Sequence, residues 1–224
     1  MQPPLVLFDL DNTLLDRRGT LADWAAGFTA RHRLPDEEQA YVRGMVAERA
    51  YPSTFRAIHT RYRLPVSATE LWRAYCTDIS AMVSCPAAVL DGLNELRAVG
   101  WRVGVATNGA VDIQRAKLRA TGISERVDGV FVSEEAGSRK PQTRHFALAA
   151  ARCGAVLDDG GWMVGDNPVN DIDGGRSAGL RTIWVDNGLS WPPDDPGPDY
   201  TVPHARAAID LLLLHSADHM RTMA

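Results

Sequence analysis

PLVLFDLDNT, residues 4–13, is the stretch that decides the fold of this 224-residue chain. Residues 4–10 are apolar apart from Asp9, and a continuous apolar run is typical of a strand buried on both faces of a parallel sheet. Two carboxylates, Asp9 and Asp11, stand one residue apart at the carboxyl end of this run. A charge in so apolar a segment costs free energy unless it has a partner. The pair therefore indicates a site at the strand end.

The sequence after residue 85 alternates between short apolar runs and segments with helical spacing. VGVA at residues 103–106 and TIWV at residues 182–185 resemble the first run. A weak strand near Tyr200 and a helix from about His204 are expected to end the pattern. Such alternation predicts an α/β fold with a doubly wound parallel sheet, formed by residues 1–15 and 86–224.

Residues 16–85 show helical spacing and few strand signals, which predicts a helical cap of about four helices inserted after the first strand. Ser67 stands three residues before Glu70, the spacing of a capping box. The segment has ten Arg, no Lys and eight Asp or Glu, a net charge of +2 against −6 for the remainder. A mildly positive cap suits phosphorylated substrates. Trp24 and Phe28, four residues apart, are expected in the cap's own core.

Composition excludes several classes of function. A net charge of −4 and a pI near 5.9 are too acidic for a general nucleic-acid binder. No apolar run is long enough to cross a bilayer, and no leader is recognised. Three unpatterned cysteines suggest reduced thiols. We expect a soluble cytoplasmic protein, monomer or homodimer, with no nucleic-acid or membrane partner.

Polar residues follow the other predicted strands as well. Ligands of open parallel sheets bind outside the carboxyl ends of the strands, so these residues are expected to meet. They are Thr107 and Asn108 after the second strand, Lys140 in the segment before the next helix, and Asp166 and Asp171 after the fourth strand.

This set of side chains has a chemical logic. Four gathered carboxylates repel each other, and a hard cation such as Mg²⁺ would offset them while sharing a substrate phosphate. Lys140 supplies a further positive charge suited to a phosphate oxygen. Thr107 and Asn108 can donate hydrogen bonds to phosphate, and the helix predicted near Gly109 would direct free backbone N–H groups to the same place.

The arrangement favours phosphoryl transfer to a carboxylate. Asp9, fixed at the strand tip, is the candidate nucleophile that would form an aspartyl phosphate. Asp11, two residues on, can face the same substrate. It would protonate the leaving oxygen and later activate water, provided that anionic neighbours or burial raise its pKa.

Four motifs now resemble those of the haloacid dehalogenase (HAD) superfamily: DLDNT at 9–13, TN at 107–108, RKP at 139–141 and GDNPVND at 165–171. The resemblance implies a Rossmann-like core, Mg²⁺ and an aspartyl-phosphate intermediate. It implies metal ligation by the Asp9 side chain, the Asp11 carbonyl and Asp166, with Asp171 supporting the metal's water shell or Lys140. Thr107 and Lys140 would hold the phosphoryl group. The helical insert resembles the C1 cap of the superfamily's phosphatase branch.

The predicted activity is a Mg²⁺-dependent phosphatase acting on a small phosphorylated metabolite, of the nucleotide, sugar phosphate or phosphoglycolate type. The resemblance disfavours a dehalogenase, because members of the superfamily with that activity have a non-acidic residue where Asp11 stands. A phosphonate hydrolase is disfavoured because its cap lysine has no counterpart in 16–85. A phosphomutase stays open, and so does a non-enzymatic receiver-like switch or binding module.

Most site residues also have a plain structural alternative. Asp9 could be a turn residue at the end of the strand. Asp11 could form an Asx turn and Asn108 could shape a turn with Gly109. Asp166 or Asp171 could cap the helix that follows. Lys140 could be a solvated surface lysine, although the chain contains only one other, Lys117.

Overall fold

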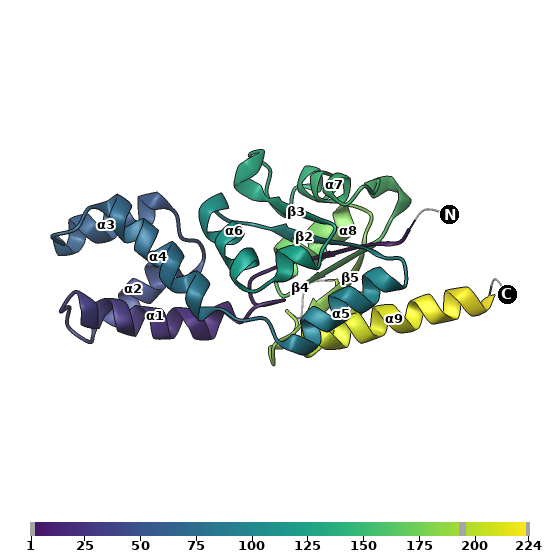
Figure 1. Cartoon of the computed structure of the whole chain (residues 1–224), viewed down its shortest axis with the longest axis horizontal. Helices are drawn as coiled ribbons and strands as arrows, with labels where there is room; N and C mark the ends of the chain where they lie inside the picture. Colours follow the sequence, from purple (N-terminus) through teal and green to yellow (C-terminus); the bar gives the residue numbers. More distant parts are fainter. Residues whose placement is uncertain (1–2, 193–195, 223–224) are drawn as a thin grey trace. The chain divides into compact units, whose positions relative to one another are not determined.

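The computed structural model describes residues 3–192 and 196–222 and forms two compact units (Figure 1). The first unit comprises residues up to 15, 85–108 and the chain from 122 onward, and the second comprises 16–84 and 109–121. The second unit therefore includes a segment that the sequence-based division assigns to the core. The division into a catalytic core and a cap at 16–85 stays a prediction.

The first unit contains a sheet of six parallel strands. They are β1 (Leu5–Phe8), β2 (Arg102–Thr107), β3 (Gly129–Val132), β4 (Trp162–Gly165), β5 (Arg181–Val185) and β6 (Tyr200–Val202). Their order is β3-β2-β1-β4-β5-β6, so the chain winds outward from β1 in one direction and from β4 in the other. The doubly wound parallel sheet is thus confirmed. Ligands of such sheets bind where the winding reverses, between β1 and β4.

Helices cover both faces of this sheet (Figure 1). The helices α7 (Thr143–Arg152) and α8 (Gly174–Ser177) contact strands on one face, and α5 (Ala87–Ala98) and α9 (Ala205–Thr222) pack together on the other. Strand β6 and helix α9 confirm the expected end of the pattern. Short helical turns complete the connections: Ile123–Glu125, Ser133–Glu135, Leu157–Asp159 and a π-helical turn at Pro168–Asp173.

Strand β1 is buried on both faces, which explains its continuous apolar run. Leu5 and Leu7 belong to a core cluster with Phe146 of α7, whereas Val6 and Phe8 alternate to the opposite face and are fully buried. A strand buried in this way has a fixed register, and the residue that follows it is held in a defined place.

The second unit is helical. Its elements are α1 (Arg17–Arg31), α2 (Glu38–Ala47), α3 (Pro52–Tyr62), α4 (Ala68–Met82) and α6 (Val111–Ala120). The four helices predicted between residues 16 and 85 are confirmed, and so is the capping box. The amide of Glu70 donates to the Ser67 hydroxyl (3.2 Å), and the Ser67 amide donates to the Glu70 carboxylate (2.8 Å). Helix α6 joins this unit by packing on α4.

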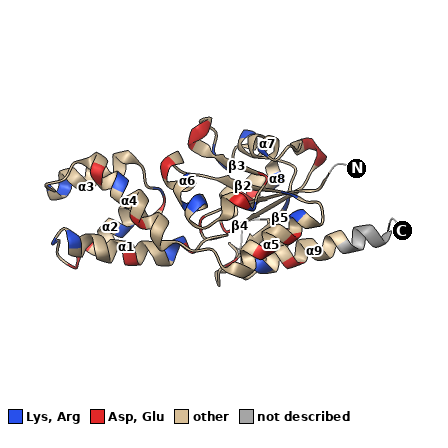
Figure 2. Ribbon diagram, viewed as in Figure 1, with Lys and Arg blue, Asp and Glu red and all other residues tan. Residues whose placement is uncertain are grey.

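Aromatic side chains form the core of the second unit. Trp24, Phe28, Phe55, Trp72 and Tyr75 are all buried, with neighbouring ring centroids between 4.9 and 6.1 Å apart. The prediction that Trp24 and Phe28 belong to this core is confirmed. Figure 2 shows that Lys and Arg residues alternate with Asp and Glu residues along the helices of this unit. No helix in the described part of the chain is long and apolar enough to cross a membrane.

Candidate active site

The site is built at the carboxyl edge of the sheet, where three neighbouring strands end at similar levels. Phe8, the last residue of β1, pairs in register with Val105 of β2 and Val164 of β4. The next residue, Asp9, donates its amide to the Val164 carbonyl (2.8 Å), so the sheet's hydrogen bonding continues through the carboxylate-bearing residue. Asp166 follows directly after β4 at the same edge.

Lys140 bridges two carboxylates at this edge. Its Nζ lies 2.6 Å from Oδ1 of Asp9 and 2.7 Å from Oδ1 of Asp171, and its side chain is 2% exposed. The alternative of a solvated surface lysine is therefore wrong. A buried ammonium with two carboxylate partners is strongly held in place, because removing either partner would leave a buried charge unpaired.

Asp171 is fully buried and both of its oxygens are engaged. While Oδ1 accepts from Lys140, Oδ2 accepts the amide N–H of Asn167 (3.0 Å). The cap of the following helical turn is Asn167, whose side chain accepts from the amide of Asn170 (2.8 Å). Asp171 is therefore a partner of Lys140, not the cap of that turn.

Gly165 allows Asp171 to approach the end of β4. A Cβ at this position would lie 2.3 Å from the carboxylate carbon of Asp171, closer than any real contact. This requirement was not predicted. The sequence signal for it is a glycine at the end of an apolar strand, which often marks a close approach of another group to the backbone.

Asn108 contacts the main chain of Lys140 with both ends of its carboxamide. Oδ1 accepts the Lys140 amide N–H (2.9 Å) and Nδ2 donates to the Lys140 carbonyl (3.0 Å). A contact between Asn108 and phosphate stays a prediction. The contact that is present joins the end of β2 to the loop that carries the lysine.

Three carboxylates lie close together at this edge, and Lys140 contacts two of them. Asp9, Asp166 and Asp171 each offer an oxygen, and these oxygens all lie within 4.8 Å of one another. The indole N–H of Trp184 on β5 donates to the Asp166 carbonyl (2.9 Å) and holds that loop. One lysine leaves an excess of negative charge, and an all-oxygen donor set of this size fits a hard divalent cation.

The pKa values reflect that imbalance. Burial raises the pKa of Asp9 to about 8; Lys140 acts against the rise, and the Asp171 and Asp166 carboxylates add to it. Burial would lower the pKa of Lys140, but the Asp171 and Asp9 carboxylates outweigh burial and hold it above its usual range. The lysine is thus firmly charged, and a further cation would favour the ionised form of Asp9.

The remaining predicted residues lie along the same edge. Thr107 is the last residue of β2 and is 1% exposed. Asp11 is partly buried and forms an isolated bridge with Leu15. The hydroxyl of Thr13 is buried and has no hydrogen-bond partner among the described residues. The roles proposed for Thr107 and Asp11 stay predictions, and no role was predicted for Thr13.

Two further supports were not foreseen. The side chain of Asn187, in the loop after β5, donates to the carbonyl of Asn12 (2.7 Å) and so braces the turn that carries Asp11. His145 of α7 is fully buried, and its Nδ1 lies 2.8 Å from the carbonyl of Ser138 in the lysine loop. The contact between Asn187 and Asn12 has no sequence signal, because the two residues lie 175 positions apart and only the fold brings them together, whereas Ser138 and His145 are seven positions apart.

Arg17 lies near Asp9 and Asp11 in the sequence, and its side chain contacts the carboxyl end of α2. Its side chain is buried in the second unit and donates to the carbonyls of Val46 (2.6 Å) and Ala47, the last residues of α2. A cation is favourable at a helix carboxyl end.

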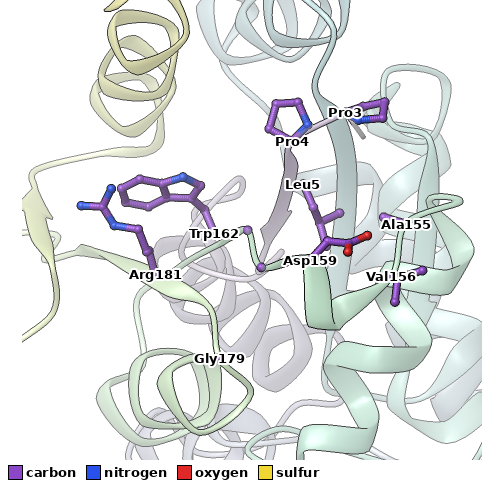
Figure 3. Close-up of a pocket in the computed structure, with 11 residues that line it drawn as sticks. Pro3, Pro4, Leu5, Ala155, Val156, Asp159, Trp162, Gly179 and Arg181 are labelled. Atoms are coloured by element: carbon purple, nitrogen blue, oxygen red, sulfur yellow. The ribbon is translucent and has the colours of Figure 1, made fainter. Parts of the chain in front are cut away.

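A separate hollow of about 530 Å³ lies at the opposite edge of the sheet (Figure 3). Leu5, Trp162 and Arg181, the first residues of β1, β4 and β5, are among those that line it. The guanidinium of Arg181 lies 4.1 Å from the centroid of the Trp162 ring. Because this hollow faces the amino ends of the strands, it takes no part in the carboxylate site.

Comparisons with known proteins agree with this fold. The family model described as haloacid dehalogenase-like hydrolase matches residues 6–185. A phosphoserine phosphatase of Thermus thermophilus is 35% identical over 167 residues, which cover 71% of this chain and 66% of that enzyme. An N-acetylmuramic acid 6-phosphate phosphatase of Pseudomonas aeruginosa is 28% identical, with 95% and 96% covered. The HAD-hydrolase YfnB of Bacillus subtilis, solved with magnesium, has the same fold, with a TM-score of 0.73, 20% identity, and 95% and 99% covered.

Proposed function

We infer that the site described above hydrolyses a phosphate ester. This chain belongs to the haloacid dehalogenase-like hydrolase family and is a phosphoric monoester hydrolase. The proposal is a Mg²⁺-dependent phosphatase that acts on a small phosphomonoester through an aspartyl phosphate on Asp9. The single observation that carries it is the position of Lys140, 2.6 Å from Asp9 and 2.7 Å from Asp171 at the carboxyl edge of the sheet.

Asp9 is the proposed nucleophile. A carboxylate oxygen of Asp9 attacks phosphorus, the bond from phosphorus to the ester oxygen breaks, and Asp11 gives its proton to the departing alcohol. Asp11 then takes a proton from water, which attacks the aspartyl phosphate and releases inorganic phosphate while Asp9 regains its carboxylate. The partly buried position of Asp11, two residues after Asp9, supports this assignment.

Asp9, Asp166 and the main chain of Asp11 are the proposed ligands of Mg²⁺, with Asp171 nearby. The ion would neutralise the site and the developing charge on the phosphoryl oxygens. Lys140 orients Asp9 and binds a phosphoryl oxygen, and Thr107 donates a hydrogen bond to the same group. Because Asp171 already holds Lys140 and accepts from Asn167, we propose that it acts mainly on the lysine.

The proposal is tested by measuring phosphate release from a panel of esters, with Mg²⁺ or with EDTA. Names of the relatives suggest phosphoserine, pyrimidine nucleotides and N-acetylmuramic acid 6-phosphate for the panel, to which sugar phosphates and phosphoglycolate are added. We expect Mg²⁺-dependent release that Asp9→Asn abolishes. A phosphomutase would instead return an isomeric ester, and release that persists in Asp9→Asn would refute the nucleophile.

A further inference from the structure

We propose that Asn108 is a positioning residue for Lys140 and not a ligand of the substrate phosphate. Its carboxamide holds the main chain of Lys140 on both sides of the Cα atom, by the bonds of 2.9 Å and 3.0 Å described above. The role assigned to Lys140 rests on the proposed function, but the contact itself does not.

The first reason is the match between the two groups. A carboxamide has an accepting oxygen and a donating nitrogen. The main chain of a single residue offers one N–H before its Cα atom and one carbonyl after it. Asn108 therefore satisfies both main-chain groups of Lys140 at once, as a neighbouring strand would. An aspartate could accept the N–H but would set a second oxygen against the carbonyl, and a leucine of similar size could make neither bond.

The second reason is the demand that Lys140 makes on its support. Its flexible side chain must deliver Nζ between Asp9 and Asp171, whose oxygens lie 2.6 and 2.7 Å away. Ordering a lysine side chain costs free energy, and a fixed starting point at Cα limits where Nζ can reach. Since the Lys140 side chain is 2% exposed, a shift of the loop would leave its buried ammonium without the two carboxylate partners.

The other supports of this loop act on different residues. The side-chain oxygen of Gln142 accepts the Arg139 amide (3.3 Å), and His145 contacts the Ser138 carbonyl. Gln142→Leu is therefore a matched control for Asn108→Leu. Both changes replace an amide by an aliphatic side chain, but only one of them touches the main chain of Lys140.

The chain offers a direct readout because it contains only two lysines, Lys117 and Lys140. Lysine labelled with nitrogen-15 gives two side-chain ammonium signals in NMR, and the signal that Lys140→Met removes belongs to Lys140. We expect Asn108→Leu to shift or broaden the Lys140 signal and to leave that of Lys117 unchanged. Gln142→Leu should leave both near their original positions.

A Lys140 signal that stays in place in Asn108→Leu would overturn the proposal. The Lys117 signal, from a residue 1% exposed, reports whether the second unit of the variant is folded, and a urea unfolding curve reports the same for the whole chain. If Asn108→Leu fails to fold, Asn108→Asp is read instead, since it keeps the accepting bond and the size of the side chain. None of these spectra needs turnover, so the proposal can stand even if no phosphatase activity is found.

Measurements of turnover provide a second test of the proposal. Asn108→Leu should lower kcat about 100-fold, the cost of a misplaced reacting group, and its effect should shrink to less than about twofold in a Lys140→Met background. The same factor in both backgrounds would mean that Asn108 contacts the phosphate by itself, and would overturn the proposal. Affinity for inorganic phosphate, measured by calorimetry in the same four proteins, should follow the same pattern.

Discussion

The ammonium nitrogen of Lys140 lies 2.6 Å from Oδ1 of Asp9, although 131 positions separate the two residues in the chain. Both side chains are buried and Asp171 completes the cluster at 2.7 Å from the same nitrogen. This relationship joins the end of β1 to the loop before α7, so it links the chemistry of the site to the stability of the first unit.

Lys140→Met should destabilise the protein, because the fully buried Asp171 carboxylate would lose its counter-charge. Breaking a buried ion pair typically costs about 3–5 kcal/mol, measured here as the free energy of unfolding in urea without divalent cations. Adding Asp171→Asn to this variant should recover part of the loss. Unchanged unfolding in Lys140→Met would show that the cluster contributes nothing to stability.

Gly165→Ala should impair the site through a single methyl group. Its Cβ would lie 2.3 Å from the carboxylate carbon of Asp171, so Asp171 must move and carry Lys140 with it. Overpacking of this kind costs about 1–3 kcal/mol, and we expect kcat to fall about 100-fold. Gly27→Ala is the control, because nothing lies within 4 Å of its Cβ. Equal activity in the two variants would contradict the role of Gly165.

A divalent cation should change how stability depends on pH. Without it, burial holds the pKa of Asp9 at about 8 against an ordinary 3.8. The native state then keeps a proton that the unfolded state loses, and stability falls as pH rises from about 4 to 8. Millimolar Mg²⁺ should reduce this fall and raise the melting temperature, and Asp166→Asn should weaken the effect. Identical melting curves with Mg²⁺ and with EDTA would argue against a cation at this site.

His145 should produce the opposite trend at acid pH. Burial, with a contribution from the Lys140 charge, lowers its pKa to about 4 from an ordinary 6.5. The unfolded state therefore binds a proton that the native state excludes, and stability is lost as pH falls from about 6.5 to 4, by up to about 3 kcal/mol. The difference in the free energy of unfolding between wild type and His145→Gln, measured across this pH range, isolates the contribution of His145. A difference that does not vary across this interval would refute it.

Much of the fold could be predicted because the strands are buried on both faces. Continuous apolar runs such as LVLF and TIWV identified the parallel sheet, and its carboxyl edge then gathered Asp9, Lys140, Asp166 and Asp171. Local rules also sufficed for the Ser67 capping box, since two residues three positions apart, Ser67 and Glu70, determine it. These features depend on neighbours in the sequence or on one general property of parallel sheets.

Contacts between distant segments could not be predicted in the same way. Asn108 was expected to donate to phosphate, yet the sequence contains nothing that pairs it with the main chain of Lys140, 32 residues away. The brace from Asn187 to Asn12 and the close approach of Asp171 to Gly165 depend on loop paths that only the folded chain defines. The packing of helix α6 on α4 likewise joins segments that are distant in the sequence.

The central claim is that Asp9 carries the phosphoryl group during turnover. The most direct test is to quench the enzyme in acid while it hydrolyses a radiolabelled phosphate ester, and to map the labelled peptide by mass spectrometry. We predict label on the peptide that contains Asp9, and none in Asp9→Asn. Rapid release of phosphate with no label on the protein, or with label on another residue, would contradict the account.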